Sequence, residues 1–431
     1  MAVSTETLRE WVVDARKRTL RLAATLEADQ LLGPRSPIVN PPLWELGHVA
    51  WFQERWVLRH AAGRRPLRPD GDALYDSAAV PHDVRWDLPL PSLDEIVAQL
   101  SAVQDAVLER IAEERPGDEY FVLLSVYHED MHAEAMAFTR QTLAYGRPTL
   151  GPPRGPGSRS DADGSIAGDV AVPGGTFVLG SRREEPFVFD NEKWAHAVEL
   201  APFSIARAPV TQLGYLEFVE DGGYRRPELW TSEGWRWREQ ARAEHPVYWR
   251  REGRDWMRRD FDAWLPLEPN RPVVNVSWHE ANAWCRWARR RLPTEAEWEA
   301  AASACEDGRG RRAPATRRYP WGDRPAGPAR ANLDFRALAA ADVGDLPEGD
   351  SALGCRQLLG NVWEWTASDF LPYAGFSPDP YKEYSQPWFG THKVLRGGSF
   401  ATTSRLVHCA FRNFYTPDRR DPWAGFRTCA S

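Results

Sequence analysis

Hydrophobic residues in the first third of the chain recur at helical spacing. From Ser92 onward, apolar residues stand alternately three and four positions apart, which is the pattern of a helix that buries one face. That stripe consists of Ile96, Leu100, Val103, Val107 and Ile111. Such a stripe is typical of a helix packed in a bundle.

Capping residues divide residues 1–146 into four predicted helices. The helices are expected to begin at a Thr7 and Glu10 capping box, at Asn40 with two prolines in the first turn, at a Ser92 and Glu95 box, and at Asp118. The second should end near His60, and the fourth should run over 118–145 with Gly146 as its C-cap. Four helices of this length predict one bundle.

The pattern changes after residue 146. Residues 147–165 are rich in Pro, Gly and Ser without periodicity, which predicts a connector between two domains. In 166–431, short apolar or alternating segments such as 175–179 and 273–278 dominate. Helices are expected only near 279–290 and from Thr294, which forms a capping box with Glu297. The predicted class is therefore α+β, with a bundle followed by a domain of little regular structure.

Composition narrows the range of partners. The 431 residues carry a formal net charge of -7, with 54 basic and 61 acidic residues well mixed, so we expect small-molecule partners rather than nucleic acid or a membrane. No apolar run approaches the roughly 18 residues of a membrane span, and the charged start does not resemble a signal peptide, which predicts a cytoplasmic protein. Five scattered cysteines without CxxC spacing indicate neither a disulfide framework nor a thiolate zinc site. The 21 tryptophans favour an irregular fold or an aromatic-walled ligand site.

Three histidines form a candidate metal site. His128 and His132 are four residues apart, so their imidazoles leave one helix face with Cβ atoms about 6 Å apart. His48 lies between Trp44 and Trp51 at helical spacing, which predicts that it faces the bundle interior. Three neutral imidazoles on ferrous iron would leave up to three positions open. The residues alone leave a second interpretation open, in which the pair decorates the surface and His48 is a hydrogen-bonded core residue.

Longer motifs resemble known families. The segments VAVPGGTFVLGS, LPTEAEWEAAA, LLGNVWEWTASDF, VLRGGSF and FRNFYTPDRR strongly resemble the formylglycine-generating-enzyme-like fold, a variant of the C-type lectin fold, across most of 170–429. GHVAWFQERW and the HxxxHxE at 128–134 resemble the DinB-like bundle of the ergothioneine sulfoxide synthases. The resemblance implies a nonheme Fe(II) enzyme that uses O2 to join sulfur or selenium to C2 of the hercynine imidazole, with His48, His128 and His132 as ligands.

The same resemblance implies a substrate-binding segment at FRNFYTPDRR. Asn413 offers amide hydrogen bonds, and Phe414 and Tyr415 offer ring faces to a quaternary ammonium. Arg419 and Arg420 offer paired guanidinium N–H donors to a carboxylate or to sugar oxygens. The alternative, that the aromatic residues are core and the arginines solvated, stays open. The family's catalytic tyrosine should be one of Tyr373, Tyr381 and Tyr384.

The expected donor pocket departs from the actinobacterial ergothioneine pattern. Where that type has an arginine pair, this chain has His82 and Arg85, and where that type has an aspartate, this chain has Tyr415. The residue before His132, which is often Gln in that family, is Met131. This combination most resembles the selenoneine synthase branch, which implies a selenosugar donor, 1-seleno-N-acetylglucosamine. The alternative is an ergothioneine sulfoxide synthase that uses cysteine or gamma-glutamylcysteine.

Two further functions compete with these. A formylglycine-generating oxidase needs a cysteine pair for copper, but Ser404 stands five residues before Cys409 where the partner is expected. A noncatalytic lectin-like binding module is the other alternative, and three histidines at the positions of the family's ligands argue against it.

Overall fold

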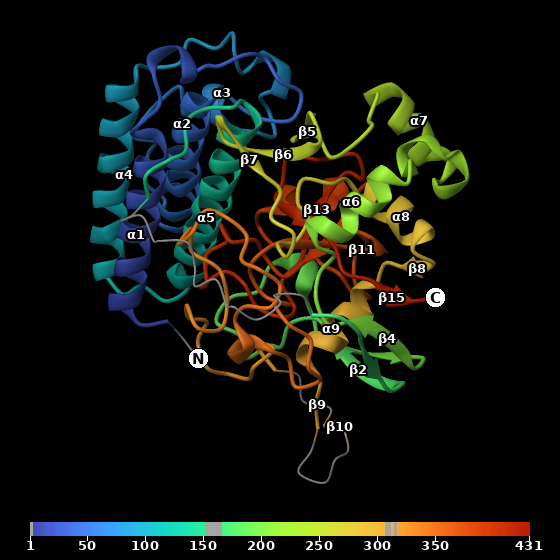
Figure 1. Ribbon diagram of the computed structural model, residues 1–431. Helices are drawn as coiled ribbons and strands as arrows, with labels where there is room; N and C mark the ends of the chain where they lie inside the picture. The colour runs from blue at the N-terminus through green and yellow to red at the C-terminus, as the bar shows by residue number, and fades with distance from the viewer. Residues whose placement is uncertain (1–2, 151–165, 307–311, 314–316) are drawn as a thin grey trace. The chain divides into compact units, whose positions relative to one another are not determined.

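The computed structural model describes residues 3–150, 166–306, 312–313 and 317–431, and it divides into two compact units (Figure 1). The first unit contains the helical region up to about residue 150 and also takes in Glu184–Phe187. Within this unit the Phe187 ring packs against Tyr120 and Tyr127, with ring centroids 5.1 Å apart in both pairs. Most of the connector expected at 147–165 lies outside the described residues.

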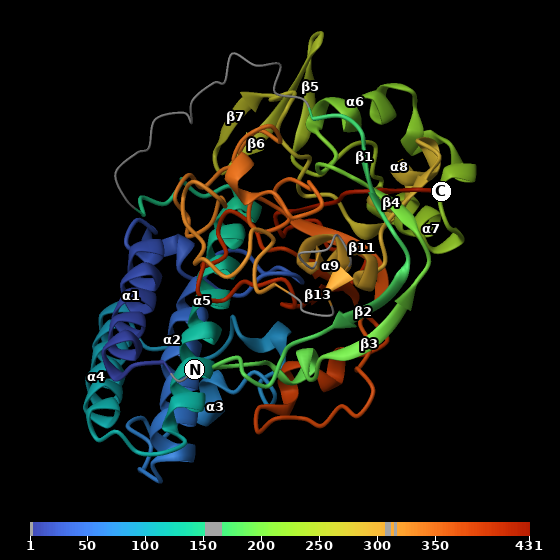
Figure 2. The same ribbon diagram turned by 90° about the horizontal axis from the view of Figure 1, so that it is seen from below.

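The first unit is a helical bundle. Its helices are α1 (Thr5–Ala23), α2 (Pro42–Gln53), which continues as the π-helical η2 (Glu54–Ala61), α3 (Gly71–Tyr75), α4 (Leu93–Ala112) and α5 (Asp118–Thr142), with single turns η1 (Ala28–Gln30) and η3 (His82–Val84). Helices α1 and α2 each pack against both α4 and α5, as the second view also shows (Figure 2). The five residues of the predicted α4 stripe are the buried residues of that helix, and Ser92 with Glu95 forms its capping box, so this prediction is confirmed.

Several predicted helix boundaries were wrong, including that of α2, which begins at Pro42 with Pro41 as its N-cap rather than at Asn40. Helix α1 begins two residues before the expected box, because the Ser4 hydroxyl accepts a hydrogen bond from the Thr7 amide (3.1 Å) and is the N-cap. Helix α5 ends at Thr142 rather than at Gly146, since Ala144 takes a left-handed conformation with φ 56° and turns the chain away.

The second unit is built from small sheets, which confirms the mixed α+β class. Their strands are β1 (Asp169–Val172), β2 (Gly175–Leu179), β3 (His196–Leu200), β4 (Phe203–Ala206), β5 (Trp249–Glu252), β6 (Asp255–Asp260), β7 (Ala263–Pro266), β8 (Arg290–Arg291), β9 (Cys305–Glu306), β10 (Arg312–Ala313), β11 (Trp363–Asp369), β12 (Lys393–Arg396), β13 (Asn413–Tyr415), β14 (Ala424–Gly425) and β15 (Cys429–Ala430). The two four-stranded sheets have the orders β1-β4-β15-β8 and β13-β12-β11-β14, so strands far apart in sequence are neighbours. Of the two predicted segments, 175–179 is strand β2, whereas 273–277 is irregular and residue 278 begins a helix.

Helices of the second unit begin after hydroxyl caps. They are α6 (Gln212–Glu220), α7 (Ser232–Ala241), α8 (Trp278–Trp287) and α9 (Glu295–Ser303), capped by Thr211, Thr231, Ser277 and Thr294. The expected box of Thr294 and Glu297 is confirmed. Helices α6 and α7 were not expected, because neither carries a long apolar stripe. Short 3-10 turns occupy Asp190–Glu192, Gly223–Arg225, Pro227–Leu229, Pro347–Gly349, Lys382–Tyr384 and Gln386–Trp388.

Buried arginines organise the loops of the second unit. Arg396, Arg412 and Arg427 are at most 1% exposed, and each pairs with a buried glutamate. Each arginine also donates to loop carbonyls, as Arg427 does to Arg356 (2.9 Å). Because buried carbonyls need donors and this unit has few long strands to supply them, the arginines take that role.

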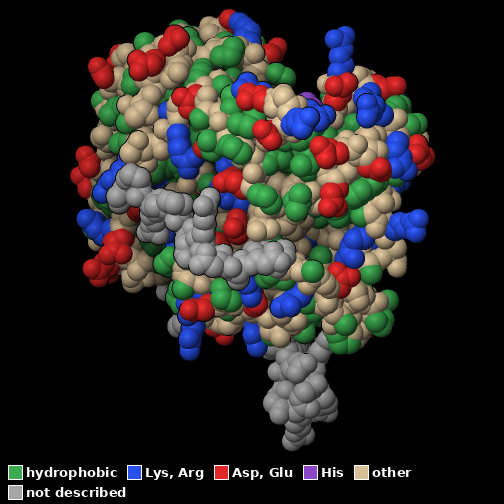
Figure 3. All heavy atoms as spheres, in the orientation of Figure 1, with side chains coloured by type: hydrophobic (Ala, Val, Ile, Leu, Met, Phe, Trp, Pro, Cys, Tyr) green, Lys and Arg blue, Asp and Glu red, His purple; other side chains and the backbone are tan. Residues whose placement is uncertain are grey.

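No helix in the described part of the chain is long and apolar enough to cross a membrane. On the face shown in Figure 3, acidic and basic side chains are interspersed among the coloured residues.

Candidate metal centre

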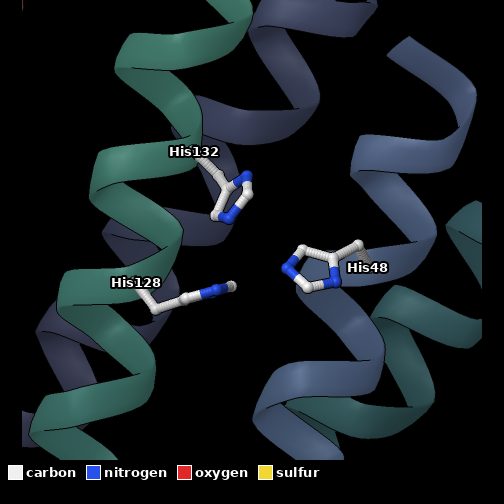
Figure 4. Close-up of side chains that lie close together, drawn as sticks. All are labelled: His48, His128 and His132. Carbon is white, nitrogen blue, oxygen red and sulfur yellow. The ribbon is translucent and has the colours of Figure 1, made fainter. Parts of the chain in front are cut away.

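The three candidate histidines converge inside the first unit. His48 comes from α2, and His128 and His132 come from successive turns of α5 (Figure 4). One ring nitrogen from each lies within 4.8 Å of the other two. Nitrogens bound to one ion at about 2.1 Å lie at most about 4.2 Å apart, so a small side-chain rotation would let the three share an ion. His48 and His128 are buried, and His132 is half-buried.

A backbone carbonyl orients the His48 ring. The Nδ1 of His48 donates to the Tyr75 carbonyl oxygen (2.8 Å), and since a carbonyl only accepts, Nδ1 carries the hydrogen and Nε2 keeps a lone pair for a metal. Tyr75 approaches α2 closely at Gly47, where an added Cβ would lie 2.2 Å from the tyrosine ring. Glycine is therefore needed at this position of α2.

Two tryptophans flank the His48 imidazole. Its ring centroid lies 4.7 Å from that of Trp44, nearly parallel at 11°, and 5.7 Å from that of Trp51. Both indoles are anchored through Nε1, which donates to the Leu74 carbonyl (2.8 Å) and to Asp72 Oδ1 (2.7 Å) respectively. The short helix α3 therefore holds His48 and both of its neighbours.

A buried carboxylate orients His132. Nδ1 of His132 is hydrogen-bonded to Oε2 of Glu45, and the Asn40 amide donates to Oε1 of the same carboxylate (2.7 Å). Burial alone would raise the pKa of Glu45, but His132 beside it and these hydrogen bonds hold that pKa at about 2. Because an ionised carboxylate only accepts, His132 Nδ1 is the donor and its Nε2 is the candidate ligand.

His128 is held by stacking. Its ring lies against that of Phe52, with centroids 3.4 Å apart and planes 3° apart. Glu45, His48 and Phe52 stand three and four residues apart on α2, so one helix face contributes a candidate ligand and contacts the other two histidines.

Burial keeps the buried histidines neutral. It lowers the pKa of His48 to about 3, helped by His132, and lowers the pKa of His128 well below its ordinary value. Neutral imidazole is the form that binds metals, so burial does not oppose binding here. Three neutral nitrogen donors without a thiolate suit a divalent transition metal such as Fe(II) and leave positions for substrates.

The residues predicted to bind the sulfur or selenium donor differ in their burial and in their contacts with the histidine cluster. Arg85 is buried, donates to Asn40 Oδ1 (2.6 Å) and places its guanidinium carbon 3.9 Å from the Trp44 ring centroid. His82, in η3, is half-buried. Met131, also half-buried, precedes His132 on α5. The structure therefore brings Arg85 into contact with neighbours of the candidate metal ligands, and the substrate-binding roles of Arg85, His82 and Met131 stay predictions.

The predicted substrate-binding segment belongs to the second unit. Asn413, Phe414 and Tyr415 form the half-buried strand β13, and the Phe414 ring stacks on Phe370 at 3.9 Å. The neighbouring arginines are ion-paired, because Arg419 binds Asp421 (2.5 Å) and Arg420 binds Glu280 (2.9 Å). Arg419 lies 5.1 Å from the Tyr415 ring and Arg420 lies 5.5 Å from the Trp237 ring. The alternative of solvated arginines was therefore wrong, while substrate binding stays a prediction.

The three candidate tyrosines have different surroundings. Tyr373 donates to Glu295 Oε1 (3.3 Å), and burial raises its pKa well above the ordinary value. Tyr384 stacks on Phe189 at 4.5 Å, lies 5.9 Å from the Phe414 ring and also has a pKa raised by burial. Tyr381 lies 6.1 Å from Tyr384. Tyr381 and Tyr384 thus share a cluster with the predicted substrate segment. Tyr373 instead belongs to the buried group in which Arg396 and Arg412 also bind Glu295.

The sequence reasoning missed the residues that orient the histidines. Glu45 had a usable signal, since it lies three residues before His48 and so shares its helix face. No sequence pattern marks Asn40, Asp72 and Tyr75 as neighbours of the histidines. They lie outside α2, and whether they reach it depends on the path of the intervening loops.

Known proteins resemble this chain along nearly its whole length. Residues 157–431 match the sulfatase-modifying factor enzyme 1-like domain, and residues 12–136 match the DinB superfamily. A hercynine oxygenase of Mycolicibacterium thermoresistibile is 40% identical, with 97% of this chain and 94% of the relative covered. A hercynine oxygenase of Mycolicibacterium smegmatis is 38% identical, with 99% of both chains covered. A formylglycine-generating enzyme of Streptomyces coelicolor is 34% identical over 62% of this chain and 90% of its own length.

Proposed function

Because the chain belongs to the family of the hercynine oxygenases, we propose that it is an iron- and O2-dependent enzyme that oxidatively joins a sulfur donor to hercynine. The hercynine oxygenases match 97% or more of this chain and therefore both units, whereas the formylglycine-generating enzyme of Streptomyces coelicolor covers 62% of it. The cluster of His48, His128 and His132 carries the proposal, because it lies within the residues that match the DinB superfamily and outside those that match the sulfatase-modifying factor enzyme 1-like domain.

The donor set fits ferrous iron. When bound, Fe(II) on three neutral imidazoles would supply the redox chemistry that activates dioxygen, together with open positions for a thiolate. The chain itself determines which nitrogen two of the three rings offer to a metal. Tyr75 and Glu45 accept the Nδ1 hydrogens of His48 and His132, so Nε2 is the nitrogen left for a metal in both rings. Trp44, Trp51 and Phe52 surround the rings and limit the access of water.

Cysteine or gamma-glutamylcysteine is the donor that we propose first. The hercynine oxygenases are similar over their whole length, and an ergothioneine-type sulfoxide synthase is the reaction class that this similarity supports. A selenosugar is the second candidate. It is favoured by Tyr415 and His82, which stand where the actinobacterial type has an aspartate and an arginine.

A product assay tests the proposal and ranks the donors. Protein loaded with Fe(II) under anaerobic conditions is exposed to air with hercynine and one donor at a time: cysteine, gamma-glutamylcysteine or 1-seleno-N-acetylglucosamine. Mass spectrometry should detect a product in which hercynine has gained the thiol and oxygen, and metal-free protein should give none. An efficient product from the selenosugar alone would replace the sulfur assignment with the selenium one. Unchanged hercynine with every donor would overturn the proposed function.

A further inference from the structure

The Arg85 side chain is connected to His132 through two polar residues. Its Nη1 donates to Asn40 Oδ1 (2.6 Å), Asn40 Nδ2 donates to Glu45 Oε1 (2.7 Å), and the other oxygen of Glu45 binds His132. An arginine only donates and a carboxylate only accepts, so just one orientation of the Asn40 amide satisfies both partners. The donors and acceptors of this hydrogen-bond chain, from Arg85 through Asn40 and Glu45 to His132, are therefore fixed.

Arg85 also contacts a neighbour of His48. The guanidinium carbon lies 3.9 Å from the centroid of the Trp44 ring, and that ring is nearly parallel to His48 at 4.7 Å. A further hydrogen bond from Nη2 to the Val80 carbonyl (3.2 Å) fixes the plane of the guanidinium. One side chain thus supports two of the three candidate ligands by separate routes.

Charge and burial make this arrangement costly to disturb. Glu45 is 3% exposed and Arg85 is 7% exposed, so the cation compensates a carboxylate that water cannot reach. Loss of Arg85 would leave Asn40 Oδ1 without its donor and would remove a buried positive charge that interacts with Glu45. The Glu45 carboxylate would then be free to turn away from His132.

We propose that Arg85, acting through Asn40 and Trp44, is a positioning residue that sets the metal affinity and geometry of the histidine centre. The proposal deepens the proposed function and rests on it. It differs from a role in donor binding, because the Arg85 guanidinium donates to two protein acceptors, Asn40 Oδ1 and the Val80 carbonyl.

Metal titration separates positioning from donor binding. Fe(II) affinity, measured by competition with a chelator, and the visible spectrum of the Co(II)-substituted protein are compared for wild type, Asn40→Asp and Arg85→Met. Asn40→Asp keeps the size of the side chain and its bond to Arg85, but it sets a negative oxygen against Glu45. Both variants should bind Fe(II) about 10–100-fold more weakly and shift the Co(II) bands.

Controls keep the outcomes distinct. Arg140→Lys changes another buried arginine of this unit, whose bonds go to the Leu22 and Gly146 carbonyls, and it should leave the Co(II) spectrum unchanged. Wild-type affinity and spectrum in folded Asn40→Asp, or in Arg85→Met with only a raised KM for the donor, would overturn the positioning role. A wild-type protein that binds no metal would instead overturn the proposed function itself.

Discussion

Glu45 and His48 lie one turn apart on α2 and hold different parts of the same cluster. Glu45 accepts a hydrogen bond from Nδ1 of His132 on α5, whereas His48 is itself one of the three candidate ligands. Because both residues belong to one rigid turn, the relative placement of His48 and His132 is determined by α2 as well as by the packing of α2 on α5. The packing of α2 on α5 therefore brings the three imidazoles together.

Glu45→Gln should weaken metal binding while the fold is retained. The amide oxygen can still accept from His132, but the negative charge that favours the Nδ1-protonated tautomer is lost. We expect Fe(II) affinity to fall about tenfold, measured by chelator competition. Glu54→Gln is the matched control, because Glu54 is another buried glutamate of the same region and accepts only from the Leu67 amide among its described bonds. Equal affinities in wild type and Glu45→Gln would contradict this prediction.

Gly47→Ala should destabilise the first unit. A Cβ at this position would lie 2.2 Å from the Tyr75 ring, so the tyrosine must move together with the carbonyl that binds His48. We expect a loss of about 1–3 kcal/mol in the free energy of unfolding, measured with urea, and weaker metal binding. Gly214→Ala is the control, because its new Cβ would lie 3.6 Å from the nearest atom, Thr211 Oγ1, which is an ordinary contact distance. This variant should lose no stability. Equal stability of Gly47→Ala and wild type would show that Tyr75 adjusts freely.

Glu192 should make the stability of the second unit depend on pH. Burial raises its pKa from 4.5 to about 8, although Ser181 and two arginines act in the opposite direction. Between these values the folded chain holds a proton that the unfolded chain has lost, so this contribution to stability disappears as pH rises from about 4.5 to 8.

Thermal unfolding of Glu192→Gln at several pH values checks this sign. The Tm of the variant should rise relative to wild type between pH 5 and pH 8, because the amide cannot ionise. Glu244→Gln, at an exposed site in the same unit, should follow wild type at every pH. A constant difference between Glu192→Gln and wild type would contradict the prediction.

The sequence predicts features that depend on local spacing. The α4 stripe, the caps at Ser92 and Thr294 and the His128–His132 pair all lie within one or two helical turns, so each can be recognised without knowledge of the tertiary fold. The start of α1 was missed because Ser4 and Thr7 are both competent caps and only the hydrogen bond decides between them.

Features that depend on loop paths could not be predicted. The Tyr75 carbonyl reaches His48 across 27 residues, and Arg85 reaches Asn40 across 45, with no periodic pattern to mark either contact. The same holds in the second unit, where buried arginines bind carbonyls that are distant in sequence. A backbone carbonyl can belong to any residue type, so its role as an acceptor leaves no trace in composition or motif.

The iron content of the anaerobically loaded protein tests the histidine centre most directly. Wild type, His128→Ala, His132→Ala and the control His60→Ala, an exposed histidine of η2, are loaded with Fe(II), desalted and analysed for metal. We predict one iron per chain in wild type and in His60→Ala, and loss of iron in the other two variants with unchanged circular dichroism. Iron at the wild-type level in His128→Ala and His132→Ala would contradict the assignment of these imidazoles as ligands.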